Sequence, residues 1–474
     1  MKIHKTGWNM LLFGMLLLVS GIILGSAAVE GLKDATGAIS TEKVVVEVKP
    51  EWKGGDRKIL TMEILKKLEK KLQNNLIAYT VEPKTSKQTI ESNGSRTQVI
   101  LAGIGGRYNM FRRFEFVYGG FSPAFSKSGA PKIALVSEDF AWERFKTHNA
   151  IGQTIQVYGE SFVIAGVFRN GRGVLHLLTK EELPEVLIPA GTMLELDSGA
   201  IIASFETAAD KSEIYNSGRN LILTALRQEG LDESRLDVSD FSVHQKLMLQ
   251  KPMIIVFLTG FITIIFLGLQ AFIGFKEIIR GIRSIYADYD LSNTLRAGIR
   301  TYGGEMIKTS VFLAFIFVVW RFSAFDFFIL PEYVPGETPD MQKYADLLRE
   351  SIRNTFSGVS DKASFSIRLL QATRMLTDMI LCLSVFGGLI FTRIGTKLLR
   401  NQFINAGVSI WKAGGGLFLC LAVVLGLCYV SELPMSIYTK GILIVWIYIA
   451  SGLQFGTDNL PSCPINEKGS VYIA

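Results

Sequence analysis

The chain has 474 residues, 49% of them hydrophobic, and its mean hydropathy is +0.30. An ordinary soluble domain is less apolar, so this composition predicts a membrane protein. The formal net charge of +7 is explained by cytoplasmic loops rich in Lys and Arg. The sequence has no dense basic tract with interleaved aromatics, so nucleic-acid binding is not expected.

The first apolar run, Trp8 to Ala28, is long enough to span a bilayer, which takes about 20 mostly apolar residues. Lys2 and Lys5 precede this run, so the N-terminus is expected in the cytoplasm. A cleaved signal peptide is the competing interpretation, because Ser26-Ala27-Ala28 offers small residues for cleavage.

Further apolar segments follow a long polar insert that contains no run able to span a bilayer. They are Pro252 to Phe275, Thr309 to Leu330, Leu376 to Phe391, Ala413 to Val430 and Ile437 to Leu453. Basic residues cluster after the second and fourth spans, which places these loops and both termini in the cytoplasm. The sequence therefore predicts an α-helical multi-pass protein of the plasma membrane, with about six spans and an α+β extracytoplasmic domain between spans one and two.

This topology divides the chain into regions with different surroundings. They are the N-terminus and first helix (1–36), the extracytoplasmic domain (37–245), a stalk with the second and third spans and a cytoplasmic loop (246–330), an acidic extracytoplasmic loop (331–374), and the last three spans with a cytoplasmic tail (375–474).

The insert shows alternating strand and helix patterns. Strands are predicted at Val44–Val48, Leu76–Val81, Gln98–Ala102, Lys132–Val136, Thr154–Val157, Ser161–Phe168, Glu185–Ile188 and Ala200–Phe205. Amphipathic helices are predicted at Asp56–Leu72 and Ala209–Glu229, and Ser137 is expected to cap a further helix. From Ser242 to the second span the only strong breaker is Pro252, so a helix is expected to run from the domain toward the bilayer.

The sequence contains no catalytic or metal-binding motif. Cys382, Cys420, Cys428 and Cys463 all lie outside the insert, which must therefore fold on its own core. The four histidines are scattered, and no phosphate loop of the form G-x-x-x-x-G-K-[ST] is present. We therefore expect no catalytic residue, cofactor or metal in this chain.

One stretch carries a more specific pattern. It reads FVYGGF at 116–121, KIALVSEDFA at 132–141, IGQTI at 151–155 and YGESFVIAGV at 158–167. This run resembles the extracytoplasmic core domain of MacB-type ABC transporter permeases, the FtsX-like superfamily. The resemblance implies a separate ABC ATPase subunit that binds ATP, and assembly of the permease as a homodimer or heterodimer.

The membrane part matches this family less closely, because the family usually has three helices after the domain and five are predicted here. The family's coupling loop, which docks on the ATPase, is loosely echoed by Phe275–Arg283. The resemblance therefore implies a candidate coupling loop, with Arg393–Asn401 as the alternative. The candidate residues are Lys276, Glu277, Arg280, Gly281 and Arg283.

Two charged residues, Arg321 and Asp326, fall within the predicted third span. Charges inside a membrane are costly and often functional, but both residues lie toward the outer end, where they can reach the interface.

The leading hypothesis is a permease subunit that couples a separate ATPase to motion of its extracytoplasmic domain, in efflux, lipid or peptide extraction, or mechanotransmission. The alternative is a membrane-anchored receptor or scaffold that keeps the domain without ATPase coupling.

Overall fold

The structure is a computed structural model that describes residues 2–454 with internal gaps. The gaps are 54–58, 73–75, 86, 93–94, 127–131, 170, 172, 181, 209–216, 287–290, 330–341, 343–345, 347–348, 350–362 and 401–405. Most of the predicted acidic loop 331–374, the start of the predicted helix 209–229, and Cys463 therefore lie outside the described residues.

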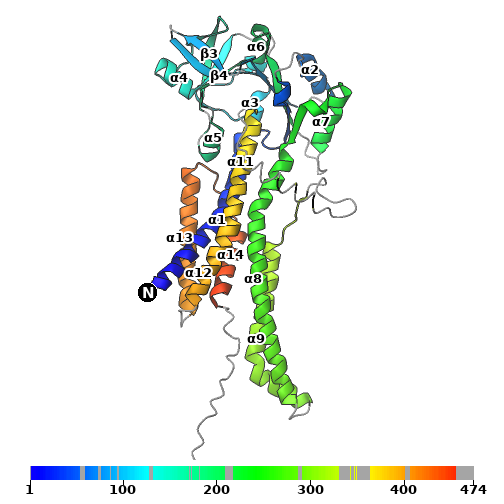
Figure 1. The fold of residues 1–474 in the computed structure, drawn as a ribbon, viewed down its shortest axis with the longest axis vertical. Helices are drawn as coiled ribbons and strands as arrows, with labels where there is room; N and C mark the ends of the chain where they lie inside the picture. The colour runs from blue at the N-terminus through cyan, green and yellow to red at the C-terminus, as the bar shows by residue number, and fades with distance from the viewer. Residues whose placement is uncertain are drawn as a thin grey trace, which may run out of the picture.

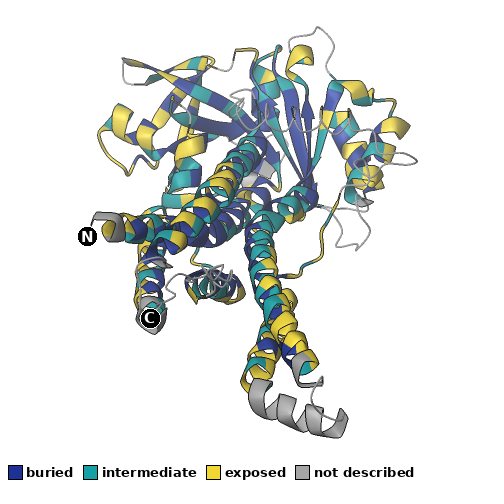
Figure 2. Cartoon of the chain, turned by 60° about the horizontal axis from the view of Figure 1, so that its bottom comes forward, coloured by how far each residue is buried: buried dark blue, intermediate teal, exposed yellow. Residues whose placement is uncertain are grey.

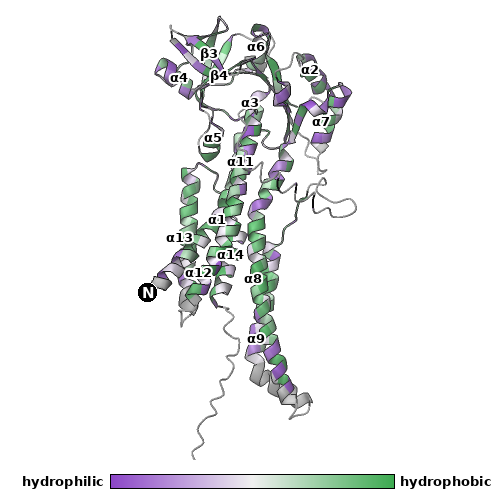
Figure 3. Cartoon of the chain, viewed as in Figure 1, coloured by the Kyte–Doolittle hydropathy of each residue, from purple (hydrophilic) through white to green (hydrophobic). Residues whose placement is uncertain are grey.

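Long helices stand below a domain of strands and short helices (Figure 1), and the helices are predominantly apolar (Figure 3). They are α1 (Lys2–Ala35), α8 (Phe241–Tyr286), α9 (Leu291–Ser323), α11 (Phe365–Cys382), α12 (Leu389–Arg400), α13 (Ala406–Val430) and α14 (Thr439–Gln454). The π-helical η5 (Leu383–Gly388) joins α11 to α12 without a break. Among the described residues, five helical segments are long and apolar enough to cross a membrane, and Thr439–Gln454 is a shorter apolar helix.

Helix α1 lies inside the bundle and contacts α8, α11, α12, α13 and α14. Its closest approach is to α12, where two glycines leave no room for a side chain. A Cβ atom at Gly14 would lie 2.4 Å from the backbone N of Thr392, and one at Gly395 would lie 2.6 Å from the backbone N of Leu11. Small residues let membrane helices approach closely and gain packing energy that lipid does not supply.

Helix α8 confirms the expected continuous helix from the domain toward the membrane, since it runs for 46 residues with Pro252 inside it. Helix α9 packs along α8 but ends at Ser323, so the predicted span to Leu330 is too long. After α9 the chain extends, and the side-chain amide of Gln250 donates to the carbonyl of Phe328 (3.0 Å) and accepts from its N–H (3.3 Å). These bonds replace those that a longer helix would make.

The domain is built on one mixed sheet. Its strands are β1 (Lys43–Val48), β2 (Ile77–Glu82), β3 (Lys87–Ser92), β4 (Ser95–Gly106), β5 (Glu115–Gly119), β6 (Ile133–Ser137), β7 (Thr154–Val157), β8 (Glu160–Arg169), β9 (Glu185–Pro189), β10 (Ile201–Ala208) and β11 (Leu236–Asp240). The order is β11-β1-β10-β2-β4-β3-β7-β8-β6-β9, with β5 beside β8, and β9 also pairs with β4. One half of the sheet is therefore open and antiparallel, and the other half closes on itself.

Short helices connect these strands. They are η1 (Pro50–Trp52), α2 (Met62–Lys71), α3 (Tyr108–Phe111), η2 (Pro123–Ser126), α4 (Glu138–Phe145), α5 (Val174–Thr179), α6 (Ala190–Leu196), α7 (Ser217–Gln228) and η3 (Glu233–Arg235). The Ser137 cap is confirmed, because its hydroxyl accepts from the N–H of Phe140 at 3.3 Å. Tyr158 and Gly159 both have positive φ, 53° and 79°, as a tight β7–β8 hairpin turn requires.

Strand β1 joins the domain to the helices. All six of its residues are buried. Val44, Val46 and Val48 belong to the core of the domain, whereas Val45 belongs to the apolar cluster of the helix bundle. Because side chains alternate between the faces of a strand, β1 packs on the sheet's core with one face and on the bundle with the other.

The α1–α12 contact gives the first testable prediction. We expect Gly14→Ala to destabilise the full chain in detergent by about 1–3 kcal/mol or more, because the new methyl group meets backbone atoms of α12. The matched control is Gly415→Ala, since a Cβ atom there has no neighbour within 4 Å. Thermal unfolding followed by size-exclusion chromatography compares the variants, and equal melting temperatures would refute the close contact.

Candidate functional site at the domain–helix junction

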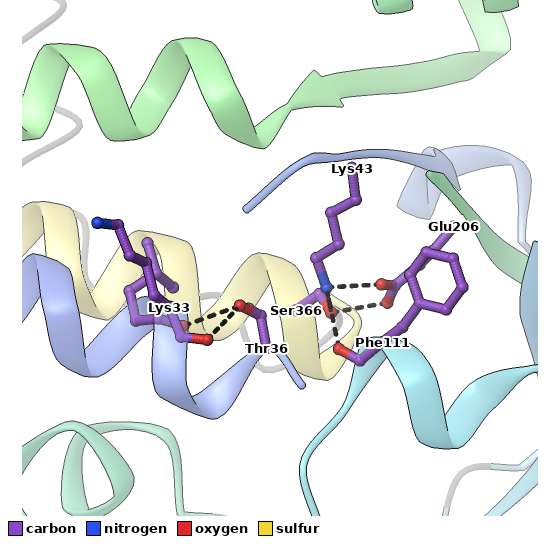
Figure 4. A network of polar contacts seen from close by, with 7 residues as sticks. Lys33, Thr36, Lys43, Phe111, Glu206 and Ser366 are labelled. Atoms are coloured by element: carbon purple, nitrogen blue, oxygen red, sulfur yellow. Dashed lines mark hydrogen bonds and ion pairs between the residues drawn. The ribbon is translucent and has the colours of Figure 1, made fainter. Parts of the chain in front are cut away.

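A fully buried lysine lies where the domain meets the helices. Lys43, the first residue of β1, has 0% of its surface exposed. Its Nζ donates to Glu206 Oε2 on β10 (2.6 Å), to Ser366 Oγ on α11 (2.8 Å) and to the carbonyl of Phe111 on α3 (3.3 Å), as Figure 4 shows. The Ser366 hydroxyl in turn donates to Glu206 Oε1 at 2.7 Å.

Two features of its surroundings act on the pKa of Lys43 in opposite directions. Burial lowers the pKa of Lys43, and the carboxylate of Glu206 opposes this shift. The ammonium group also lies 4.8 Å from the ring centroid of Phe241, the first residue of α8. A buried charge is costly unless it is paired and hydrogen-bonded, so these elements are held in one arrangement around Lys43.

The first turn of α11 is held by a second carboxylate. The backbone N–H of Ser364, which precedes α11, donates to Glu47 Oε1 on β1 at 2.6 Å. Burial raises the pKa of Glu47, and the bond from Ser364 opposes that shift. The open N–H groups at a helix N-terminus favour acceptors and negative charge, which Glu47 and Glu206 supply from the sheet.

Arg112 extends these contacts to the closed half of the sheet. Its guanidinium donates to both oxygens of Glu185 on β9, each at 2.8 Å, and lies 4.0 Å from the ring centroid of Phe365 on α11. Burial works against ionisation of Glu185, but Arg112 nevertheless holds the pKa of Glu185 below its ordinary value. Arg112 therefore connects the closed half of the sheet, through Glu185, to the start of α11.

A further polar contact joins α8 and α11 on the membrane side of this junction. Lys251 Nζ lies 2.7 Å from Asp378 Oδ1 and donates to Thr377 Oγ1 at 2.8 Å. Asp378 lies inside the predicted fourth span, where an acidic residue in an apolar run is a signal of a polar partner inside the bundle. Asp378, Lys43, Glu206, Arg112 and Glu185 were absent from the predicted site.

The predicted coupling residues take a different conformation from the one expected. Lys276, Glu277, Arg280, Gly281 and Arg283 lie in α8 rather than in a loop, because the helix continues to Tyr286. The stretch after Phe275 contains no proline, and one glycine does not end a helix. The four charged residues are exposed, whereas Gly281 is buried. The described part of the alternative loop, from Arg393 to Arg400, is also helical.

The two predicted intramembrane charges lie apart from the junction. Arg321 is exposed in the last turn of α9, and Asp326 is exposed in the extended segment after it. No ion pair joins these two described residues. Within the part of the chain that the structure describes, no group of three His, Cys, Asp or Glu side chains could hold a metal ion.

Apolar helices that carry a mixed α+β domain at one end are typical of a membrane protein with a folded domain outside the bilayer. Residues 10–218 match the family model of the MacB-like periplasmic core domain. This match identifies residues 10–218 as a MacB-like periplasmic core domain.

The solved structures that are similar to the chain at low identity include a region of MacB and a domain of an ABC-type transporter. The periplasmic region of MacB from Actinobacillus actinomycetemcomitans is 13% identical, with 44% of this chain and 92% of that chain covered and a TM-score of 0.35. The extracellular domain of the ABC-type transporter YknZ from Gram-positive bacteria is 15% identical, with 42% and 99% covered and a TM-score of 0.30. Among curated proteins, none matches the chain.

The buried ion pair predicts a specific pattern of stability. We expect Lys43→Met to destabilise the full chain by about 3–5 kcal/mol, because it leaves the carboxylate of Glu206 buried without its cation. The double variant Lys43→Met/Glu206→Leu should recover much of this loss. Lys132→Met is the control, since Lys132 and Glu160 form an exposed pair whose loss should cost less than about 1 kcal/mol. Unfolding in detergent measures all four proteins, and a double variant no more stable than the single one would contradict the pairing.

The Arg112–Glu185 pair predicts a dependence on pH. Because the pKa of Glu185 is lower in the folded protein, its stabilising contribution is complete above its unfolded pKa, about 4.3, and is lost as the pH falls through the lower folded value. The melting temperature of the unmodified protein should therefore exceed that of Glu185→Gln at neutral pH, and the difference should shrink below about pH 4. Glu160→Gln, at an exposed position, is the control. A difference that stays constant with pH would refute this account.

Proposed function

We propose that the chain is the permease-type membrane subunit of an ABC system, in which a separate ATPase moves the MacB-like domain through the helices. The observation that carries this proposal is the junction around Lys43, where β1, β10, α3, α8 and α11 meet in one buried network within a chain of this domain family. Displacement of α8 or α11 would therefore displace the domain.

The connections at the junction support transmission of motion. Helix α8 follows β11 without a linker, and Asp240 Oδ1 accepts from the N–H groups of Ser242 (3.0 Å) and Val243 (3.4 Å). The short connection from α1 to β1 is fixed by the bond from Ile39 N–H to the carbonyl of Met110 (3.0 Å). Both connections between the domain and the helices are therefore fixed by hydrogen bonds rather than built as flexible linkers.

The α8–α9 pair supplies a surface for the ATPase. It extends beyond the other described helices on the side away from the domain (Figure 1), and its outer surface is largely exposed (Figure 2). Lys276, Arg280 and Arg283 are exposed on this extension of α8. In our proposal these residues contact the ATPase, which binds the ATP, and a second permease subunit completes the complex in the plasma membrane. Both termini lie in the cytoplasm.

The second candidate is a membrane receptor or scaffold without ATPase coupling. It is favoured by one observation, that the expected coupling loop is a continuation of α8 rather than a separate segment. The two candidates differ in whether a nucleotide-binding subunit accompanies the protein.

Affinity purification tests the proposal. We expect the tagged full chain, extracted in mild detergent, to co-purify with a nucleotide-binding subunit that mass spectrometry identifies. The charge-reversal variant Lys276→Glu/Arg280→Glu/Arg283→Glu should lose most of this subunit. The new carboxylates would repel the partner surface that the basic side chains attract.

The matched control reverses three exposed charges on the domain, Lys66→Glu, Lys70→Glu and Arg96→Glu, and should retain the subunit. Absence of any nucleotide-binding subunit from the unmodified protein would refute the permease proposal and favour the receptor. Equal retention by both variants would refute only the docking surface.

A further inference from the structure

A groove of about 300 Å³ opens between α8, α12 and α14. Ile262 and Phe266 line it from α8, Ile390 and Arg393 from α12, and Tyr448 from α14. Ile390 is 53% exposed, so the groove opens toward the surroundings of the bundle. Its walls are apolar except for one guanidinium and one phenol hydroxyl, and the hydroxyl donates to the carbonyl of Leu389 at 3.4 Å.

The neighbouring helices show the depth of Arg393 in the membrane. Thr392 lies against Gly14 of α1, and Gly395 lies against Leu11. The apolar run of α1 begins at Trp8, so Arg393 lies about 5–9 Å inside its start, at 1.5 Å per residue. An arginine at this depth reaches the level of the lipid phosphates while its stem stays in apolar surroundings.

Aromatic residues place the membrane interface at the same end. Gly416 of α13 lies against Leu12 of α1. Trp411 precedes Gly416 by five residues and Trp8 precedes Leu12 by four, at about 1.5 Å each, so the two tryptophans lie at about the same level. Trp411 is 85% exposed, as expected for a tryptophan in the interfacial belt. Arg393 is therefore about one helical turn inside the headgroup level.

The charge around the groove is positive. Residues 379–431 and 433–456, which include α12, α13 and α14, contain no Asp or Glu, and neither do the first 29 residues. The acidic residue of α8 is Glu277, about 16 Å along the helix from Phe266. Lys397, one turn beyond Arg393, and Lys412 are exposed at this end. A ligand that carries negative charge would be attracted here.

We infer that this groove binds an anionic phospholipid from the bilayer. The headgroup phosphate accepts hydrogen bonds from Arg393, whose guanidinium lies 4.1 Å from the ring centroid of Phe266. An acyl chain packs along Ile262, Phe266 and Ile390. A net anionic headgroup is favoured over a zwitterionic one because no carboxylate lines the groove to pair with a choline or ethanolamine cation.

Native mass spectrometry of the full chain, delipidated and then mixed with phosphatidylglycerol and phosphatidylcholine at equal concentration, tests this inference. We expect phosphatidylglycerol to be preferred. Arg393→Leu should lower the preference about fivefold, as one lost basic residue at a lipid surface implies. Arg393→Lys should keep most of it, and excess inorganic phosphate should not displace the lipid.

Lys412→Leu is the matched control, because it removes the same charge from the same end of the bundle outside the groove. Equal loss in Arg393→Leu and Lys412→Leu would overturn the inference in favour of diffuse attraction. Displacement by inorganic phosphate would overturn it in favour of a free-anion site. The melting temperature of Arg393→Leu in phosphatidylcholine shows whether the variant is folded, and Arg393→Lys carries the test if it is not.

Discussion

The buried ammonium group of Lys43 is the constraint on which the arrangement of domain and helices depends. A lysine that is shielded from solvent can be paired only by groups of the protein. The ammonium group of Lys43 donates to a carboxylate on β10, a hydroxyl on α11 and a carbonyl on α3, and it lies over the ring of Phe241 on α8. If β10 moved away by itself, the ammonium group of Lys43 and the carboxylate of Glu206 would be left buried without their ion pair, which costs several kcal/mol. The elements around Lys43 are therefore held in register with one another.

Apolar packing gives this network its dry environment. The two faces of β1 belong to different clusters, so the core of the domain continues into the core of the bundle through a single strand. Helix α1 supplies the bundle side, with Leu18, Val19 and Ile22 fully buried. Its contact with α12 at Gly14 brings backbones together where a larger residue would separate them. The position of Lys43 thus depends on packing that begins far down α1.

Much of the domain could be predicted because its signals are local. Val44–Val48, Thr154–Val157 and the cap at Ser137 show their structure within a few residues, and the structure has each of them. Strand β11, Leu236–Asp240, was missed because its sequence LDVSD is largely polar and resembles a loop. Strand β5, Glu115–Gly119, was also missed, because it is only five residues long and ends at a glycine with a positive φ of 72°.

The site could not be predicted from the sequence, because its parts are distant along the chain. Lys43 and Glu206 are separated by 163 positions, and each alone looks like an ordinary charge at the end of a strand. Asp378 did show a visible signal, since it lies in an apolar run, but its partner Lys251 lies on another helix.

The partners together explain how the junction limits motion. Arg112 and Glu47 hold α11 to both halves of the sheet, while Lys251 and Asp378 hold α11 to α8 nearer the membrane. With contacts at two levels, α8 and α11 cannot slide past each other without breaking an ion pair. Tilting of the pair as one body preserves the contacts at both levels, so these contacts couple the domain to α8 and α11 together.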